Sequence, residues 1–388
     1  MRPPPRIVHL ATVDLTVRAL LLPQLLGLRE AGYDVSAISS PGPFVAEVEA
    51  AGIRHIAWRN ATRAWDPRAD ARAFAELMGI LRAERFDLVH THNAKPGVMG
   101  RIGARLARVP CVVNTVHGFD ATPEDSVARR AFFMGAEWFA ARFSHVELYQ
   151  GREDLLRARR DRIVGADKGV FLGNGIDLSR FDPCSVAPER RAALRLELGL
   201  HPEELVVGTV GRLVGDKGYR ELFLAARAVR SRHPHVRFLA VGDADPAKAD
   251  AITDRELEEA ADDVIVTGWR EDVPELLAAM DVFVLPTWRE GVPRSAIEAA
   301  AMGKPLILTD IPGCRQVARD GIEARHVPVR DPDRLADAIS MLVEDAALRG
   351  RMGAAARERA LRDFDERSVV ATIVREYTRL LGRKGLRP

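Results

Sequence analysis

The chain has 388 residues, and a prior of roughly 150 residues per domain predicts two domains for this length. Hydrophobic residues make up 47% and charged residues 29%, which is the profile of a globular protein with a packed core. The 57 Lys and Arg against 55 Asp and Glu give a formal charge of only +2. This balance argues against a nucleic-acid partner, so any basic site must be local.

The cysteines and the amino terminus predict the compartment. Cys111, Cys184 and Cys314 are odd in number and far apart, which favours neither a disulfide framework nor a structural zinc site. Asp14 and Arg18 interrupt the apolar stretch that a signal peptide would need, and no apolar run approaches the ~18 residues of a membrane span. We expect a cytoplasmic protein, with peripheral contact at the inner face of the cell membrane left open.

Short apolar runs alternate with longer amphipathic stretches, which predicts parallel sheets covered by helices on both faces. In the first part of the chain the expected strands are Ile7–Ala11, Val35–Ser39, His55–Trp58, Leu88–Thr91, Cys111–Val116, Val146–Tyr149 and Val170–Leu172. Amphipathic stretches at Pro67–Arg82 and Val127–Phe143 predict helices between them. Residues 1–183 are therefore expected to form one doubly wound domain.

A turn at Phe181-Asp182-Pro183 predicts the domain boundary, and a charged helix over Pro188–Leu198 follows it. The later expected strands are Leu205–Val210, Val236–Val241, Val264–Thr267, Val282–Leu285, Leu306–Thr309 and His326–Val329. Residues 184–365 are therefore expected to form a second Rossmann-like domain. The tail after Asp331 predicts three helices, the last of which, within residues 366–388, is expected to cross back onto the first domain.

The predicted fold class is α/β, with two Rossmann-like doubly wound domains that face each other across a cleft. In open α/β sheets, ligands bind beyond the carboxyl ends of the strands, where loops and helix amino termini meet. Two facing domains of this kind would hold two substrates between them. The loops at those strand ends are therefore the places for candidate site residues.

The loop after Leu205–Val210 begins with Gly211 and contains Arg212 and Lys217, two cations five positions apart, before an expected helix. Its glycines allow a ligand to approach the backbone, and cations at a helix amino terminus suit a diphosphate. The loop lacks the GxxxxGK[ST] of a P-loop and the GxGxxG of an ordinary dinucleotide site. The alternative interpretation is a strand-to-helix turn with solvated charges.

The segment from Pro286 to Pro305 carries two carboxylates, Glu290 in a loop and Glu298 in the helix that follows. Small neighbours suit close packing of this helix against a sheet, where the carboxylate of Glu298 needs a partner. The alternative makes Glu290 an ordinary charge at a helix amino terminus and Glu298 a solvated side chain.

At this segment the sequence resembles the retaining glycosyltransferases of family 4, which have the GT-B fold. Their hallmark of two Glu separated by seven residues matches Glu290 and Glu298. The preceding GR…K loop, the EAxAxGxP run and the turn Thr309–Gly313 match in order and spacing. The resemblance implies transfer of a hexose-type sugar from a nucleotide diphosphate sugar, UDP-sugar favoured, to a hydroxyl or lipid-linked glycan or small-molecule acceptor.

The resemblance also implies roles for these residues. Arg212 and Lys217 would neutralise the donor diphosphate as charge builds on the leaving group. Glu298 would accept hydrogen bonds from the ribose, Glu290 and the amides of Gly291–Arg294 would orient the sugar, and Trp269 with Arg270 would recognise the base, although a Trp there also suits a core. The full expected donor-binding set is Gly211, Asn174, Gly291, Val292, Pro293, Arg294, Glu298, Trp269 and Arg270.

In the first domain, His117 follows a strand at the point where family members commonly carry a histidine near the donor sugar. Its alternative is a capped histidine at a strand end. Asn174 belongs to an NGID turn, whose Asn and Gly suit a backbone with positive φ. The expected acceptor-side residues are Thr12, His92, Lys95 and Gly97.

Lys95 at a helix start would suit an acceptor phosphate. One departure is clear, because many family members have a glycine-rich loop where this chain has Thr12–Thr16. The alternation of His90 and His92 suggests a metal, but no third ligand lies nearby in the sequence, and the resemblance implies neither a metal nor another cofactor. The basic and aromatic stretch Arg129–Phe139 suits membrane contact, or a buried amphipathic helix with Arg stems on its rim.

A retaining enzyme keeps the anomeric configuration of the donor, and same-face substitution is expected because the sequence shows no candidate carboxylate nucleophile. Two alternatives remain open. A non-hydrolysing sugar-nucleotide epimerase would share the two-domain architecture, and a non-catalytic sugar-nucleotide-binding protein would close around its ligand without transfer.

Overall fold

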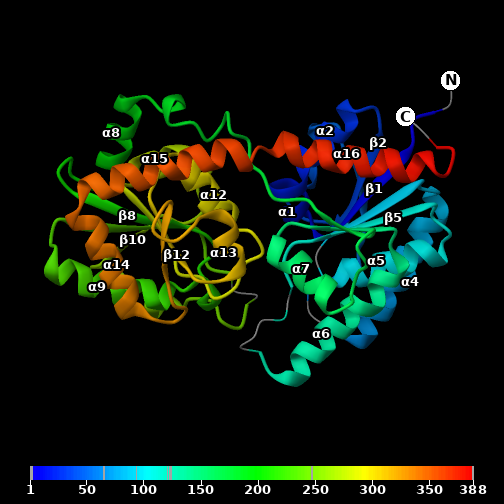
Figure 1. Ribbon diagram of the computed structural model, residues 1–388, viewed down its shortest axis with the longest axis horizontal. Helices are drawn as coiled ribbons and strands as arrows, with labels where there is room; N and C mark the ends of the chain where they lie inside the picture. Colours follow the sequence, from blue (N-terminus) through cyan, green and yellow to red (C-terminus); the bar gives the residue numbers. More distant parts are fainter. Residues whose placement is uncertain are drawn as a thin grey trace. The chain divides into compact units, whose positions relative to one another are not determined.

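The computed structural model describes residues 3–63, 66–92, 94–119, 121, 125–245 and 248–386. It divides into two compact units, Met1–Gly173 with Glu366–Pro388, and Asn174–Asp365 (Figure 1). The first unit therefore ends ahead of the expected boundary at residue 183. The reason lies in long-range contacts with unit 2, because Asn174 Nδ2 donates to the carbonyl oxygen of Val292 at 2.9 Å and Ile176 forms a bridge with Asp365.

Unit 1 contains a parallel sheet in the order β3-β2-β1-β4-β5-β6-β7. Its strands are β1 Arg6–Val13, β2 Asp34–Ser40, β3 Arg54–Ala57, β4 Leu88–His92, β5 Cys111–Val116, β6 Val146–Tyr149 and β7 Gly169–Phe171. All seven expected strands are confirmed to within a few residues. From β1 the chain continues to β2 and β3 on one side of the sheet. From β4 it continues to β5, β6 and β7 on the other side, so the sheet is doubly wound with a switch point between β1 and β4.

Helices cover both faces of this sheet (Figure 1). The helical elements of unit 1 are α1 Asp14–Thr16, a π-helical turn η1 Val17–Leu21, α2 Leu22–Glu30, α3 Val45–Ala50, α4 Pro67–Glu84, α5 Ala94–Leu106, α6 Val127–Ala140, η2 Ala141–Phe143, α7 Arg152–Arg160 and α16 Glu366–Gly382. Apolar side chains of α2 and α16 pack on one face, and those of α4 and α5 pack on the other. The last helix of the chain therefore supplies part of the core of unit 1.

Unit 2 repeats the plan with the parallel order β10-β9-β8-β11-β12-β13. Its strands are β8 Leu205–Val210, β9 Val236–Val241, β10 Val264–Val266, β11 Val282–Leu285, β12 Leu306–Thr309 and β13 Ala324–Val327. The last strand lies earlier than the expected His326–Val329. Pro328 explains the difference, because it has no N–H with which to continue the ladder.

The helical elements of unit 2 are η3 Pro183–Ser185, α8 Pro188–Glu197, η4 Gly215–Lys217, α9 Tyr219–Arg232, α10 Asp254–Ala260, α11 Val273–Ala279, α12 Arg294–Ala301, α13 Pro312–Val317, α14 Pro332–Glu344 and α15 Ala346–Asp363. Side chains of α8, α11, α12 and α15 pack on one face of the sheet, and those of α9 and α14 pack on the other. Two Rossmann-like parallel sheets are thus confirmed.

Candidate donor and acceptor sites

The switch point of unit 2 lies between β8 and β11, where the strand order reverses. Ligands of doubly wound sheets bind at the carboxyl ends of such strands. The loop Gly211–Gly218 follows β8 and the loop Pro286–Pro293 follows β11. The two motifs that the sequence singled out are therefore neighbours in space.

These two loops are held together by backbone contacts. The amide of Trp288 donates to the carbonyl oxygen of Asp216 at 2.8 Å, and Thr287 Oγ1 donates to the same oxygen at 3.1 Å. Gly218 has φ of 76°, and a Cβ on it would lie 2.0 Å from the carbonyl oxygen of Pro286. Glycine adopts this conformation more readily than other residues, and a Cβ would not fit this space, so the contact depends on a glycine at this position.

The expected phosphate-binding cations are both paired with carboxylates. Lys217 Nζ donates to Glu290 Oε1, and each of these side chains is 18% exposed. Arg212 Nη1 lies 2.7 Å from Asp245 Oδ2, and its side chain is 46% exposed. The structure thereby brings Lys217 and Glu290 together, while Asp245 is a neighbour that the sequence did not reveal.

Helix α12 carries the second carboxylate. Pro293 precedes its first residue, and Arg294 Nε lies 4.0 Å from Glu298 Oε1, one turn along the helix. Burial raises the pKa of Glu298 above its usual range, and this effect outweighs the positive charges of Arg294 and Arg180, which lower the pKa. Glu298 is therefore a partly buried carboxylate rather than the solvated one of the alternative interpretation.

The turn at Gly313 presses against the loop that carries the expected amides. A Cβ at Gly313 would lie 2.0 Å from the carbonyl oxygen of Gly291, so this position has no room for a side chain. Val292 is buried in the core of unit 2, and its carbonyl oxygen accepts from Asn174 Nδ2 at 2.9 Å. The loop Gly291–Arg294 is thus fixed from both sides.

Asn174 differs from its expectation. Positive φ occurs at Gly173, with 77°, and neither Asn174 nor Gly175 has it. The side chain of Asn174 accepts from the amide of Gly175 at 2.9 Å while its Nδ2 holds Val292. Asn174 therefore braces the loop Gly291–Arg294 through a side-chain contact and not through an unusual backbone.

The expected base-recognising residues have contrasting surroundings. Trp269 is 51% exposed, which contradicts the alternative that places it in the core. Arg270 pairs with Asp272, with Nη2 at 2.6 Å from Oδ2, and with Glu197 at 3.0 Å. Those hydrogen bonds raise the pKa of Arg270. The guanidinium of Arg270 is bonded to carboxylates, and the side chain of Trp269 is about half exposed.

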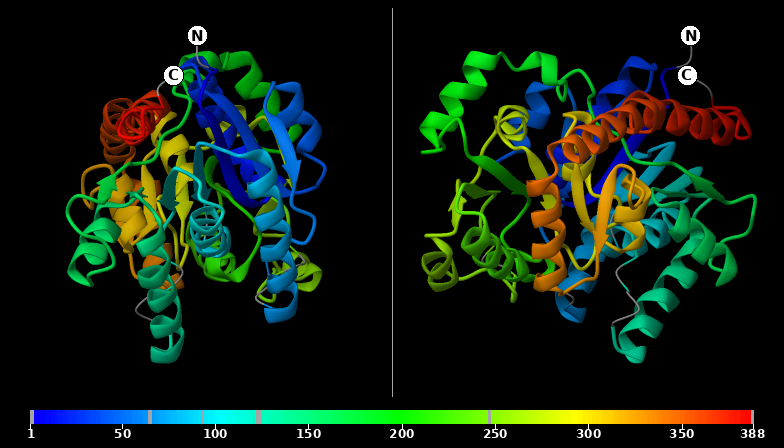
Figure 2. Two further views of the ribbon diagram at one scale, coloured as in Figure 1. Left: turned by 90° about the vertical axis from the view of Figure 1, so that its right-hand side faces the viewer. Right: turned by 60° about the vertical axis from the view of Figure 1, so that its left-hand side comes forward.

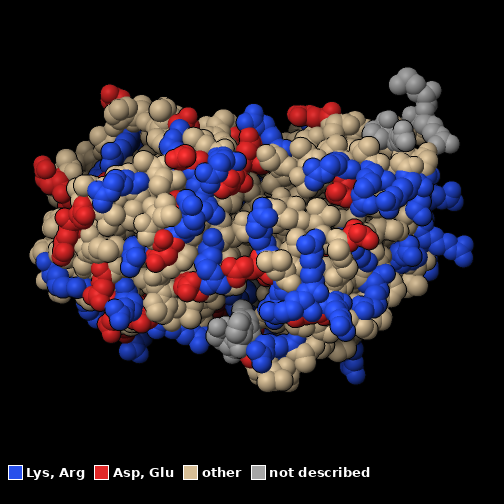
Figure 3. All heavy atoms as spheres, viewed as in Figure 1, with Lys and Arg blue, Asp and Glu red and all other residues tan. Residues whose placement is uncertain are grey.

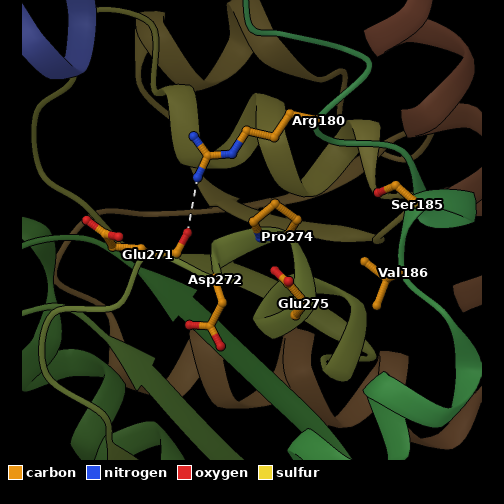
Figure 4. A pocket seen from close by; sticks show the side chains of 7 residues that line it. All are labelled: Arg180, Ser185, Val186, Glu271, Asp272, Pro274 and Glu275. Carbon is orange, nitrogen blue, oxygen red and sulfur yellow. Dashed lines mark hydrogen bonds between the residues drawn. The ribbon is translucent and has the colours of Figure 1, made fainter. Parts of the chain in front are cut away.

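A pocket of about 440 Å³ lies close to this region of unit 2 (Figure 4). Arg180 Nη2 donates across it to the carbonyl oxygen of Glu271 at 3.1 Å. Its lining consists of Arg180, Ser185, Val186, Glu271, Asp272, Pro274 and Glu275. None of the expected site residues lines this pocket, but Arg180, which does, also acts on the charge of Glu298 in α12.

In unit 1 the switch point brings the ends of β1 and β4 together. Thr12 lies near the end of β1 and is half-buried. The chain then passes directly into α1, and Asp14 accepts from the amides of Leu15 and Phe44 at 2.9 and 2.8 Å. The absence of a glycine-rich loop noted from the sequence thus corresponds to a continuous strand-to-helix connection.

His92 and His117 are connected, since His92 Nδ1 lies 3.0 Å from His117 Nε2. His92 Nε2 in turn lies 2.9 Å from Nδ1 of His9, which the sequence reading did not single out. His9, His90 and His92 each offer a ring nitrogen, and these atoms lie within 4.8 Å of one another. The third histidine that was not found nearby in the sequence is supplied by the neighbouring strand β1.

Lys95 and Gly97 belong to the first turn of α5. Lys95 Nζ pairs with Asp70 and donates to Thr62 Oγ1 at 3.0 Å, and its side chain is only 7% exposed. A Cβ on Gly97 would lie 3.1 Å from Asn114 Oδ1, so the residue serves close packing. Binding of an acceptor phosphate by Lys95 stays a prediction, and it would require Nζ to exchange its carboxylate partner.

Helix α6 is exposed along most of its length and projects from the rest of unit 1 (Figures 1 and 2). Val127, Phe132, Trp138 and Phe139 are 45% to 73% exposed. Its one buried residue is Ala140. The alternative of a buried amphipathic helix is therefore wrong for this segment. No helix in the described part of the chain is long and apolar enough to cross a membrane.

Comparisons with known proteins agree with this architecture. The family model described as "Glycosyl transferases group 1" matches residues 204–345, and the model described as "Glycosyl transferase 4-like domain" matches residues 18–175. The chain is 32% identical over 286 residues, 72% of each chain, to the UDP-Gal:alpha-D-GlcNAc-diphosphoundecaprenol alpha-1,3-galactosyltransferase of Escherichia coli.

More distant relatives cover almost the whole chain. The N,N'-diacetylbacillosaminyl-diphospho-undecaprenol alpha-1,3-N-acetylgalactosaminyltransferase of Campylobacter jejuni is 23% identical over 380 residues, 97% of this chain and 99% of the relative. Among solved structures, the crystal structure of Anabaena Alr3699/HepE in complex with UDP and glucose has a TM-score of 0.80 at 20% identity and covers 96% of this chain and 99% of that one. This likeness shows the shared GT-B fold.

Proposed function

The chain is a glycosyltransferase of family 4, and from this membership we propose that it is a retaining enzyme that moves a hexose-type sugar from a UDP-sugar to a lipid-linked glycan. The observation that carries the donor half is the contact of Lys217 with Glu290 between two loops at a switch point. The relatives from Escherichia coli and Campylobacter jejuni are named for diphosphoundecaprenol-linked acceptors. Their names support the lipid-linked class of acceptor for this chain.

In the proposed reaction, Arg212 and Lys217 stabilise the negative charge that develops on the departing diphosphate. Arg212 is paired with Asp245 and Lys217 with Glu290, so the donor diphosphate has to compete with these carboxylates. Glu298, partly buried near Arg294, is suited to accept hydrogen bonds from the ribose hydroxyls. The exposed indole of Trp269 is suited to stack on the base.

Retention follows in this proposal from substitution on a single face of the sugar. The bond from the anomeric carbon to the diphosphate oxygen breaks, the bond to the acceptor oxygen forms on the same face, and the acceptor proton passes to the departing diphosphate. His117 contacts the donor sugar in this scheme. The glycosidic product is expected to keep the anomeric configuration of the donor, which the coupling of its anomeric proton measures by NMR.

We further propose that the reaction needs no metal ion or other cofactor. Two cationic side chains at the diphosphate site supply the charge that a divalent cation supplies in other phosphate-binding enzymes. Turnover is expected to be unchanged after dialysis against EDTA. A loss of turnover that added Mg²⁺ or Mn²⁺ restores would contradict this part.

Contact with an anionic membrane surface at the inner face of the cell membrane is proposed for unit 1. This unit, residues 1–173 and 366–388, holds 30 Lys and Arg against 21 Asp and Glu, which gives a formal charge of +9. Unit 2 holds 27 Lys and Arg against 34 Asp and Glu, which gives a formal charge of −7. Basic side chains gather over α16 and around α7 (Figure 3). Exposed aromatic residues on α6 and a basic unit together suit a lipid headgroup layer.

The test of the donor half is a panel of nucleotide sugars, ranked by thermal shift and then by release of nucleotide diphosphate with and without a lipid-linked acceptor. A transferase releases the diphosphate in an acceptor-dependent way. Interconversion of sugar nucleotides without acceptor would favour the epimerase, and tight binding without any turnover would favour the non-catalytic binder. The glycosyltransferase names of the relatives favour neither alternative.

The test of the membrane contact is co-sedimentation with vesicles of phosphatidylcholine alone or with phosphatidylglycerol. Binding is expected only to the anionic vesicles, and Phe132→Ser with Trp138→Ser should weaken it. Leu196→Ser, which changes an exposed leucine of unit 2, is the matched control. Absence of binding by the wild-type protein would remove this proposal.

A further inference from the structure

A row of polar side chains crosses the face of the unit 1 sheet that α16 covers. His9 of β1 lies opposite His90 of β4, and His92 lies opposite Thr115 of β5. Tyr377 reaches the same row from α16. The three histidines and Tyr377 are 0% exposed and Thr115 is 2% exposed, so their polar atoms depend on partners within the protein.

Hydrogen bonds join this row into one line that ends at His117, which we call the histidine chain. Its successive contacts are Thr115 Oγ1 to His90 Nε2 at 2.7 Å, His90 Nδ1 to Tyr377 Oη at 2.7 Å, Tyr377 Oη to His9 Nε2 at 3.0 Å, His9 Nδ1 to His92 Nε2 at 2.9 Å, and His92 Nδ1 to His117 Nε2 at 3.0 Å. His9, His90 and His92 therefore each use both ring nitrogens for hydrogen bonds within the histidine chain.

The direction of any one of these hydrogen bonds fixes all the others. A neutral imidazole has one N–H and one nitrogen lone pair, and a tyrosine hydroxyl has one hydrogen to donate. Burial lowers the pKa of His9 to about 3 and the pKa values of His90 and His92 well below the usual range, so the three rings are neutral. Burial also raises the pKa of Tyr377, which keeps its hydroxyl protonated.

Only two arrangements satisfy every link. In the first, His9, His90 and His92 all carry their hydrogen on Nε2, and His117 Nε2 donates to His92. In the second, all three carry it on Nδ1, and His117 Nε2 accepts from His92. The three buried rings must therefore share one tautomer, and that tautomer decides whether His117 Nε2 carries a hydrogen.

We propose that His9, His90, His92 and Tyr377 are positioning residues that set the tautomer and the ring orientation of His117. This inference rests on the proposed function, because it takes His117 as the residue that contacts the donor sugar. In a neutral His117 the nitrogen Nδ1 carries the hydrogen only when Nε2 does not. The histidine chain thereby decides whether Nδ1 offers a hydrogen or a lone pair.

A metal site is the competing interpretation of the same three histidines. A metal ligand must offer a lone pair that no hydrogen bond occupies. Each nitrogen of His9, His90 and His92 already takes part in the histidine chain, so a bound cation would have to displace several of its hydrogen bonds. The contacts therefore favour the hydrogen-bonded chain.

The direct test is the ring ¹⁵N spectrum of the full-length protein labelled at histidine, with signals assigned from single His→Gln variants. His9, His90 and His92 are expected to show the same neutral tautomer. A mixture of tautomers among the three, or any of them protonated at neutral pH, would overturn the inference. Elemental analysis of the purified protein finding one zinc or other transition-metal ion per chain would also overturn it.

The functional test compares Tyr377→Phe, which removes one hydroxyl from the middle of the chain, with Tyr33→Phe. Tyr33 is the matched control because it is buried 5.8 Å from the Tyr377 ring, and its hydroxyl bonds Thr378 outside the histidine chain. Loss of the two neutral hydrogen bonds that this hydroxyl makes, with His90 and His9, predicts that Tyr377→Phe lowers kcat/KM by about 3- to 10-fold. The control should leave kcat/KM unchanged.

The two substitutions are then repeated in a His117→Ala background. A residue that acts through His117 has no further effect there, so Tyr377→Phe should no longer change kcat/KM. Equal losses in both backgrounds, or no loss in either, would overturn the inference. If thermal unfolding shows that Tyr377→Phe is not folded, Thr115→Val takes its place with the same expected outcomes. Thr115→Val removes the terminal hydroxyl of the histidine chain and keeps every ring.

Failure of the proposed function gives a different result. If His117→Ala itself leaves kcat/KM unchanged, His117 does not contact the donor sugar, and the functional part of the inference falls with that assignment. If His117→Ala is impaired and Tyr377→Phe is not, only the inference is overturned.

Discussion

Lys217 Nζ is bonded to Glu290 Oε1, so the cation expected to hold the donor diphosphate is paired with the carboxylate expected to orient the donor sugar. Each member of this pair is 18% exposed, which weakens screening by water. A diphosphate that binds Lys217 must therefore separate it from Glu290 or bind against the charge of Glu290. If both residues have their expected roles, the pair couples the occupancy of the expected phosphate site to the position of the carboxylate expected to orient the sugar.

The pair predicts opposite effects of two substitutions on UDP binding. Lys217→Ala should weaken UDP binding and lower kcat/KM by about 100-fold or more, as loss of a transition-state charge partner does. Glu290→Gln should lower kcat/KM but bind UDP at least as tightly as the wild type, because Lys217 no longer has a carboxylate partner. Calorimetric titration with UDP measures both affinities, and weaker UDP binding by Glu290→Gln would contradict the coupling.

Two glycines of the same loop should separate folding from binding. Gly218→Ala places a methyl group 2.0 Å from the carbonyl oxygen of Pro286 at φ of 76°, so the protein should lose roughly 1–3 kcal/mol of stability. Gly211→Ala meets its nearest atom, Tyr219 Oη, at 3.8 Å, an ordinary contact, so thermal unfolding should not change. UDP affinity should nevertheless fall, because the added methyl group occupies the approach to the backbone. Wild-type UDP affinity in Gly211→Ala would remove Gly211 from the donor site.

The raised pKa of Glu298 predicts a pH dependence of donor binding. The charged carboxylate is the form that accepts two ribose hydroxyl hydrogens, and burial makes it bind a proton at a higher pH than a solvated Glu does. UDP affinity should therefore fall as the pH is lowered through this raised pKa, by up to about tenfold per pH unit below it. Titrations with UDP between pH 8 and pH 5 test this, and Glu298→Gln should show a flatter profile. Parallel profiles for the two proteins would exclude Glu298 as the titrating group.

The sequence predicted the fold well because its signals are local. Most strands of both sheets contain a short apolar run between turn residues, and the order of strands and helices predicts a doubly wound parallel sheet. The Lys217 and Glu290 loops were equally visible, since each is a contiguous motif at the end of one strand. The boundary near residue 183 was misplaced because the contacts of Asn174 and Ile176 with distant residues of unit 2 have no local signature.

The histidine chain was hidden for the same reason. Its members come from three strands and from α16, and Tyr377 is separated from His90 by 287 positions. A partial signal existed in His90-x-His92 and Thr115-x-His117, since polar residues at alternate positions of a buried strand share one face. Lys95, the expected phosphate ligand, is already paired with Asp70. The two residues belong to different helices, so the sequence of neither helix alone could predict the pair.

The buried histidines predict that the protein loses stability in mild acid. The pKa of His9 is about 3 in the folded state, whereas an unfolded histidine titrates near 6.5. Between these values the unfolded state binds a proton that the folded state does not, so the free energy of unfolding falls as the pH falls below about 6.5. His90 and His92, whose pKa values are also lowered by burial, add to this slope in the same direction. Each group contributes up to about 1.4 kcal/mol per pH unit.

Urea unfolding at pH 7.5, 6.5 and 5.5 measures this slope. The wild-type midpoint should fall steeply over this range, and His9→Gln should reduce the steepness even though it lowers the midpoint at every pH, because one titrating group is gone. His201→Gln, at an exposed position of unit 2, is the matched control and should keep the wild-type slope. An unchanged slope in His9→Gln would mean that His9 is not the buried neutral ring described here, and that the acid sensitivity arises elsewhere in the protein.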